Sequence, residues 1–196
     1  MQQGTASIYE HGTLVKVAGL GVLLQGKSGV GKSETALGLV AKGHRLIGDD
    51  RICIERSSKA GLIGKGHHIN RQLIEIRDVG LINVVDLYGV KAAVDEGSIE
   101  LAVQLVAWEA APLERVEVST RSQCWLGVNI PTYLLAVSPG RDLTLLVEAI
   151  ALRHRAECEG LNQTEEFKRK LAREIGKGNE ELGFVCDGRN LGKSKK

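Results

Sequence analysis

Residues 26–33 read Gly-Lys-Ser-Gly-Val-Gly-Lys-Ser and fit the pattern G-x-x-x-x-G-K-[ST] in full. The glycines of this pattern let the backbone wrap closely, so that amide N–H groups point at phosphate oxygens. Lys32 can reach the β- and γ-phosphates of a nucleotide, and the hydroxyl of Ser33 can bind the magnesium ion between them. The predicted nucleotide-binding residues are Gly26, Lys27, Ser28, Gly29, Val30, Gly31, Lys32 and Ser33.

The segments on both sides of this loop match the setting that such a loop needs. Gly19–Gln25 is a short apolar run that predicts a buried strand. Glu34–Lys42 carries apolar residues at helical spacing, and the following Gly43 is typical of a helix stop. The alternative is a chance match in a chain with 24 glycines, which the flanking strand and helix make rare. The helix would add the positive end of its dipole to the loop.

The remaining pattern predicts an α/β protein. We expect a P-loop nucleotide-binding fold with a central, mostly parallel sheet flanked by helices, and with C-terminal helices. Extended segments are expected at Arg45–Gly48, Arg51–Glu55, Leu73–Ile76, Ile99–Trp108 and Thr132–Val137, helices at Leu143–Ala156 and Thr164–Ile175, and a loop at Ser57–Arg71. Ile82–Tyr88 fits either a strand or a helix. Residues 1–175 would form one catalytic domain, and residues 176–196 a disordered basic tail.

Composition excludes several classes of protein. The chain of 196 residues suits one compact domain, and its 43% hydrophobic and 26% charged residues are ordinary for a globular protein. A net charge of +2 gives no reason to expect binding to nucleic acid or to an anionic membrane. No secretory signal or membrane-spanning run is visible, and the four widely spaced cysteines are typical of reduced thiols. We therefore expect a cytoplasmic protein.

Acidic residues follow the loop at the point where a metal site needs them. Asp49 and Asp50 come directly after the short segment Arg45–Gly48, which would place them at the carboxyl end of a strand beside the loop. Adjacent acids point in different directions, so one can accept a hydroxyl proton while the other organises metal or structure. Glu75 lies between two isoleucines, and the pattern alone favours the exposed face of a half-buried strand over a buried ligand.

Histidines and an arginine give weaker signals. His11 stands alone before Gly12, and such a histidine is more often structural than catalytic. The pair His67-His68 lies in a polar stretch with no spaced partner, which favours solvation over metal binding. Arg115 reads as a surface residue, although an arginine that neutralises a transferring phosphate is a recurring device.

Three longer motifs resemble the catalytic domain of the HPr kinase/phosphorylase family. They are Gly-Val-Gly-Lys-Ser-Glu-Thr-Ala-Leu at 29–37, Lys-Gly-His-Arg-Leu-Ile-Gly-Asp-Asp at 42–50 and Leu-Ile-Glu-Ile-Arg-Asp-Val-Gly-Leu-Ile-Asn-Val at 73–84. His11-Gly12 and the stretch 138–142, Ser-Pro-Gly-Arg-Asp, are also similar, so the likeness runs from about Ile8 to Leu171. The motif around Glu75 is more specific than the loop.

The resemblance implies a role for each matching residue. Asp50 would accept the proton of the substrate serine and return it in the reverse reaction, and His11 would assist it. Lys32 would hold the transferring phosphate, Ser33 and Glu75 would hold Mg²⁺, and Arg115 would be the active-site arginine. The stretch near Arg141 would serve dephosphorylation. The implied cofactors are ATP and Mg²⁺, and the implied partner is the phosphocarrier protein HPr or a related small protein.

The chain also departs from the family pattern. Lys27 stands where the family usually has Asp, Asp78 where it has Gly, and Ser138 and Asp142 where it has a basic residue and Asn. These departures bear on the reverse activity and the partner rather than on the kinase residues. Family members are typically hexamers, and many carry an N-terminal domain that we expect to be absent here. A homo-oligomer, in particular a hexamer, is the expectation by resemblance.

Three functions remain open at this point. The leading hypothesis is an ATP-dependent serine kinase that phosphorylates HPr, with phosphorolysis of the phosphoserine to pyrophosphate as a second activity. A small-molecule kinase on the same scaffold would use the loop and the acid pair equally well. A non-catalytic nucleotide sensor is the third reading, and the retained proton acceptor argues against it.

Overall fold

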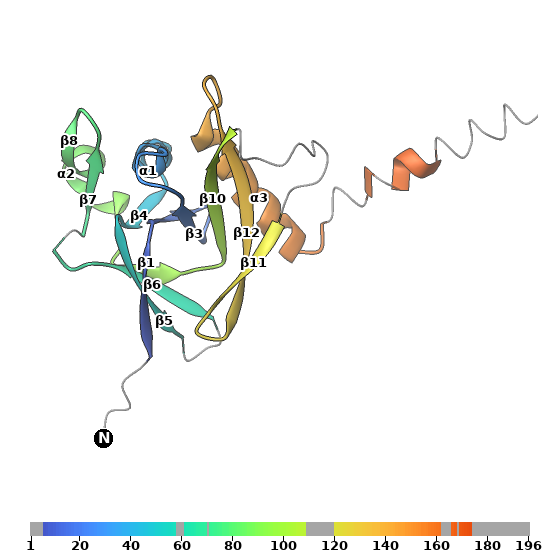
Figure 1. The fold of residues 1–196 in the computed structure, drawn as a ribbon, viewed down its shortest axis with the longest axis horizontal. Helices are drawn as coiled ribbons and strands as arrows, with labels where there is room; N and C mark the ends of the chain where they lie inside the picture. Colours follow the sequence, from blue (N-terminus) through green and yellow to red (C-terminus); the bar gives the residue numbers. More distant parts are fainter. Residues whose placement is uncertain are drawn as a thin grey trace, which may run out of the picture. The chain divides into compact units, whose positions relative to one another are not determined.

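The computed structural model describes residues 6–57, 61–69, 71–108, 120–161, 166–167 and 169–173, and it has a mixed α/β fold (Figure 1). The chain divides into two compact units, Met1–Arg155 and Ala156–Lys196. The strands are β1 (Ser7–His11), β2 (Thr13–Val17), β3 (Leu20–Gln25), β4 (Arg45–Gly48), β5 (Arg51–Arg56), β6 (Leu62–Gly66), β7 (Leu73–Ile76), β8 (Gly80–Asn83), β9 (Glu96–Ser98), β10 (Leu101–Ala107), β11 (Thr120–Trp125) and β12 (Val128–Val137). The helices are α1 (Lys32–Ala41), α2 (Val84–Tyr88), the 3₁₀ turn η1 (Val90–Ala92) and α3 (Leu143–Cys158).

The central sheet has six strands in the order β11-β12-β10-β3-β2-β4. Its middle strands β3, β10 and β12 pair in parallel, whereas the β11–β12, β2–β3 and β2–β4 pairings are antiparallel. The expected mostly parallel sheet is therefore parallel only in its centre. Two tight hairpin turns account for the difference, one between β2 and β3 and one between β11 and β12. Their central residues, Ala18-Gly19 and Leu126-Gly127, all have positive φ, which is typical of two-residue turns between antiparallel strands.

Alternate residues of the central strands pack into two separate cores. On one face, Val22, Leu24, Leu101 and Val103 join a core that α1 and α3 complete with Leu39 and Val147, among others. On the other face, Leu23 and Ala102 join a core that includes Ile52 and Ile54 of β5. That core is closed by the second sheet, β1-β5-β6-β9. The expectation of helices around the sheet thus holds for one face and is wrong for the other.

The expected loop at Ser57–Arg71 is also wrong, because it contains strand β6. Its glycines pack closely against the central sheet. A Cβ on Gly64 would lie 2.4 Å from Leu14 Cδ2, and one on Gly66 would lie 2.7 Å from the carbonyl oxygen of Ile47. Glycine at these positions allows the two sheets to approach each other closely. Because glycine is also common in turns, its frequency in this segment led the sequence analysis to predict a loop.

The other expected elements agree with the structure. The strand before the loop is β3, the helix after it is α1, and Arg45–Gly48 is β4. The ambiguous stretch Ile82–Tyr88 contains both the end of β8 and α2. Residues 166–167 and 169–173 are helical, whereas the rest of the second C-terminal helix and the tail 176–196 lie outside the described residues. Across the described ranges, no helix has both the length and the apolarity needed to cross a bilayer.

Candidate active site

The glycine-rich loop, residues 26–33, connects the end of β3 to the start of α1. Gly26, Gly29 and Gly31 have φ values of 146°, 75° and 100°, which other residues rarely adopt. A Cβ on Gly26 would lie 2.7 Å from the carbonyl oxygen of Leu105, so this position also needs glycine for space. The glycines of this loop therefore meet a conformational requirement at all three positions and a requirement for space at Gly26.

The side chain of Lys32 lies inside this wrap. Its Nζ donates hydrogen bonds to the carbonyl oxygens of Gly26 at 3.1 Å and Lys27 at 3.2 Å. The residue is only 7% exposed. The cation is thus held at the N-terminus of α1, where an anion is favoured.

Asp49 is the residue that joins the loop to its surroundings. It follows β4, is 7% exposed, and accepts hydrogen bonds from the hydroxyl of Thr13 at 2.6 Å and the hydroxyl of Ser33 at 3.1 Å. Its Oδ2 also accepts from the backbone N–H of Glu75 at 3.3 Å. One buried carboxylate therefore connects β2, α1 and β7. Its position after an apolar strand was the signal in the sequence, but the sequence did not assign Asp49 a role of its own.

Asp50 points away from this buried cluster and toward His11. A hydrogen bond of 2.9 Å from the N–H of Arg51 to the carbonyl oxygen of Asp49 closes a three-residue turn, in which Asp50 has a φ of 67°. Such a turn is rare and strained. Asp50 Oδ1 lies 3.1 Å from His11 Nδ1, and the side chains are 71% and 55% exposed, respectively. The two adjacent acids thus take separate environments, one buried and one open to solvent.

Glu75 lies on β7 with its side chain exposed, while its backbone contacts Asp49. Ser33, Asp49 and Glu75 together offer one hydroxyl and two carboxylates. Magnesium is commonly held by one or two carboxylates and substrate phosphates, with water completing the coordination, so this donor set fits it. A cluster of three or more His, Cys, Asp or Glu side chains suited to a metal is absent from the described residues.

Arg77 is a site residue that the sequence did not single out. It lies in the turn between β7 and β8, and a Cβ on Gly29 would lie 2.8 Å from its Nη2. The neighbouring Asp78 has a φ of 64°, so it adopts a conformation that glycine would accept more easily. Figure 1 shows the β7–β8 hairpin next to α1. The hairpin thereby brings a guanidinium group to the glycine-rich loop.

The other expected residues make contacts of their own or cannot be placed. Arg115 falls outside the described residues. His67 and His68 stack with ring centroids 4.3 Å apart. Asp142 accepts a hydrogen bond of 3.0 Å from the N–H of Leu145, so it caps α3. Arg141 donates to the carbonyl oxygen of Ala136 at 2.9 Å.

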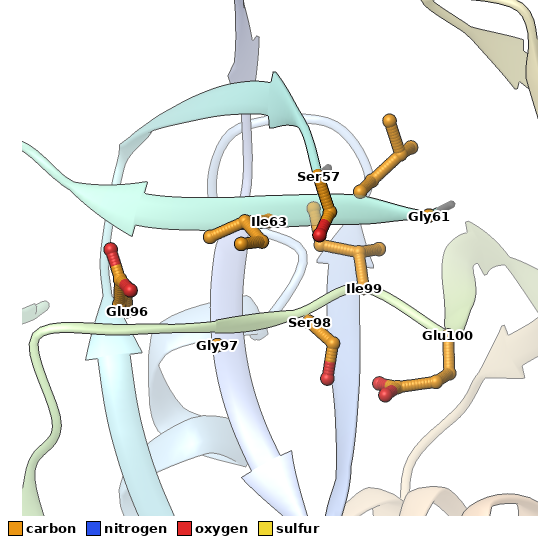
Figure 2. A pocket seen from close by; sticks show the side chains of 9 residues that line it. Ser57, Gly61, Ile63, Glu96, Gly97, Ser98, Ile99 and Glu100 are labelled. Carbon is orange, nitrogen blue, oxygen red and sulfur yellow. The ribbon is translucent and has the colours of Figure 1, made fainter. Parts of the chain in front are cut away.

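A pocket of about 380 Å³ lies where β6 and β9 approach the amino end of β10, away from the loop end of the sheet (Figure 2). Ser57, Ile63, Glu96, Ser98 and Glu100 are among its lining residues, and none of the site residues lines it. The carboxylate of Glu100 accepts a hydrogen bond from the backbone N–H of Gly21, which holds this side chain in place. The acids and the glycine-rich loop therefore lie outside this pocket.

The fold and this site define a mixed α/β protein with a glycine-rich loop, a buried acid and an exposed Asp–His pair. Residues 2–171 match the family described as HPr Serine kinase C-terminal domain, and the chain belongs to this family. It is 41% identical over 171 residues to the HPr kinase/phosphorylase of Streptococcus equi subsp. zooepidemicus, covering 87% of this chain and 55% of that protein. It is 40% identical over 173 residues to the HPr kinase/phosphorylase of Caldicellulosiruptor bescii, covering 88% and 56%.

A solved structure gives the same result. The Hpr(Ser) kinase/phosphatase from Coxiella burnetii superposes with a TM-score of 0.73 at 32% sequence identity, over 78% of this chain and 99% of that one. The chain spans about half the length of the curated relatives that it matches. The resemblance seen in the sequence motifs is thus confirmed as family membership.

Proposed function

We propose that this chain is an ATP-dependent kinase that phosphorylates a serine of HPr. The observation that carries the proposal is that two parts of the site meet. One part is the glycine-rich loop after β3, and the other is the turn after β4 that carries Asp50; we call them the two half-sites. Lys32 and Ser33 lie in the glycine-rich loop, and Asp49 links that loop to the turn that presents Asp50 to His11. Membership of the HPr serine kinase family supports the choice of reaction.

The loop half of the site would bind the nucleotide in a P-loop manner. Glycine at Gly26 and Gly29 gives the backbone room to surround phosphate oxygens, and Lys32 places a cation inside the wrap. Ser33 and Glu75 would hold Mg²⁺. Asp49 would support this set, because its carboxylate accepts hydrogen bonds from the Ser33 hydroxyl and from the backbone N–H of Glu75. Bound Mg²⁺ would neutralise part of the negative charge on the phosphates of the nucleotide. Arg77 would add a second cation beside the loop.

The acid half of the site would activate the acceptor. Asp50 accepts the proton of the serine hydroxyl, and His11 holds the Asp50 carboxylate through the contact at 3.1 Å. The same pair would return the proton in the reverse reaction, in which inorganic phosphate removes the phosphoryl group and pyrophosphate forms. Arg115 would serve as the active-site arginine, and a hexamer would be the working assembly; both rest on the family resemblance.

Exposure of the Asp50–His11 pair favours a protein acceptor over a small molecule. With 71% of the Asp50 side chain and 55% of the His11 side chain exposed, the pair is open to a residue presented by another macromolecule. Small-molecule sites are usually concave and enclose most of the ligand. The strained backbone of Asp50 argues against a non-catalytic nucleotide sensor, which has no need for a positioned proton acceptor.

The decisive experiment is transfer of phosphate from ATP to HPr in the presence of Mg²⁺, read by intact mass. One added phosphate on a serine is the expected result. Addition of inorganic phosphate to that product then tests the reverse reaction, with pyrophosphate as the readout. Confirmed ATP binding without any transfer would contradict the proposed acceptor and favour a small-molecule kinase.

A further inference from the structure

Glu10 precedes His11 on β1 but faces the opposite side of the strand. The strand alternates between exposed and half-buried residues, so His11 faces solvent while Glu10 turns toward the central sheet. Glu10 Oε1 accepts a hydrogen bond of 2.9 Å from the indole N–H of Trp125. Glu10 Oε2 accepts a longer one of 3.4 Å from the amide of Gln25. One carboxylate therefore links β1 to both β3 and β11.

The position of β1 makes this link important. The strand lies at the edge of the second sheet and pairs with β5, its neighbour in the sheet order. Gln25 is the last residue of β3, directly before the glycine-rich loop, and Trp125 is only 6% exposed. Glu10 thus connects the strand that carries His11 to the strand that leads into Gly26, and the indole of Trp125 holds the other oxygen of the carboxylate.

The arrangement leaves one buried acceptor without a donor. An ionised carboxylate can only accept hydrogen bonds, so Gln25 must turn its amide nitrogen toward Glu10. The Oε1 atom of Gln25 is then buried, and no partner for it exists among the described residues. Buried polar groups are normally satisfied, and exceptions of this kind are expected where function sets the arrangement. This unsatisfied oxygen belongs to the last residue of β3, directly before the glycine-rich loop.

We propose that Glu10 is a positioning residue that sets the His11–Asp50 pair relative to the glycine-rich loop. The inference rests on the proposed kinase function. Glu10 does not touch the reacting groups; it fixes β1, and β1 carries His11. Without the link, the edge strand can shift against β3, and the in-line geometry that phosphoryl transfer requires is lost.

The test compares Glu10→Leu with Glu10→Gln. Leucine keeps the bulk and removes both acceptors. Glutamine keeps an acceptor for Trp125 and gains a donor for Gln25 Oε1, so it restores the link without the charge. We expect Glu10→Leu to lower kcat for phosphate transfer about tenfold or more, with the ATP Kd unchanged within about twofold. Glu10→Gln should retain most of the wild-type kcat. Equal kcat in all three proteins, or a parallel loss of ATP affinity, would overturn the proposal.

A second background separates positioning from general stability. In a His11→Ala protein, Glu10→Leu should lower kcat no further, because its effect passes through His11; an additive loss would overturn the proposal. The indole N–H signal of Trp125 in an NMR spectrum gives a readout independent of activity. It should move in Glu10→Leu, and an unmoved signal would disprove the link. Failure of the wild-type protein to phosphorylate HPr would count against the proposed function, and the indole signal would still decide the link.

Discussion

The carboxylate of Asp50 meets the imidazole of His11 at 3.1 Å, although Asp50 lies in a strained turn after β4 and His11 at the end of β1. The backbone supports the contact, because the N–H of Gly12 donates to the carbonyl oxygen of Asp50 at 3.1 Å. The end of β1 and the turn after β4 are therefore joined by one backbone hydrogen bond and one side-chain contact. These contacts fix the position of the carboxylate that we propose as the proton acceptor.

Replacement of the proposed proton acceptor should separate binding from chemistry. Asp50→Asn removes the base, keeps nearly the same shape, and leaves Lys32 and Asp49 in place. We expect the ATP Kd to stay within about twofold, while kcat for transfer falls by about 10²–10⁴. Single-turnover transfer and ATP titration on the same preparations measure both quantities. Unchanged turnover would remove Asp50 as the base.

The buried neighbour should behave differently. Asp49→Asn leaves one oxygen to accept the hydrogen bonds of Thr13, Ser33 and Glu75, and it adds an amide donor in a crowded place. We expect the free energy of unfolding to fall by about 1–3 kcal/mol. The Mg²⁺ concentration needed for ATP binding should rise. Urea denaturation and Mg²⁺ titration measure these effects, with the exposed Asp86→Asn as a matched control. Wild-type stability together with a wild-type Mg²⁺ requirement would contradict this role.

An ion-pair cluster between the segment that follows α1 and helix α3 should make stability depend on pH. Hydrogen bonds from Lys42 first and His44 second hold the pKa of Glu148 below its usual 4.5. A lowered carboxyl pKa stabilises the fold above the unfolded value, and this contribution disappears as pH falls through the folded value. Glu148→Gln should therefore lower the melting temperature at pH 7 and match the wild type well below pH 4.5. A difference of the same size at both pH values would exclude this cause.

Local patterns in the sequence predicted the loop and the acid pair because those features depend on neighbouring residues. The motif at residues 26–33, the helix after it and the strand before Asp49 are all short-range signals. The separate environments of Asp49 and Asp50 could also be predicted, since adjacent residues at a strand end point in different directions. The sequence could not predict which of the two acids is buried, because the burial of Asp49 depends on its contacts with Thr13 and with strand β7.

The parts that the sequence could not predict depend on contacts between distant segments. Strand β6 was missed because its glycines pack against Leu14 and Ile47, residues far away in the chain. Arg77 carries no motif of its own, and only the β7–β8 turn brings it to Gly29. A lone His11 favoured a structural role, and its assignment to the site came from the family resemblance. Contacts between residues far apart in the chain produce no periodic pattern in the sequence, so pattern analysis cannot detect them.

Two glycines with positive φ allow the role of Arg77 to be tested. Gly29 and Gly43 have φ values of 75° and 92°, so alanine should strain the backbone by about 1 kcal/mol at each position. A Cβ on Gly29 would lie 2.8 Å from Arg77 Nη2, whereas a Cβ on Gly43 would meet nothing within 4 Å. Gly29→Ala should therefore displace the guanidinium and weaken ATP binding, and Gly43→Ala should lower stability alone.

Calorimetric titration with ATP and thermal denaturation of both variants measure the two effects separately. Arg77→Ala completes the comparison, because it removes the cation without straining the backbone. We expect it to reproduce the loss of affinity seen in Gly29→Ala while keeping the melting temperature near that of the wild type. If Gly29→Ala weakens ATP binding and Arg77→Ala does not, the loop conformation itself controls affinity and Arg77 has no part in phosphate binding.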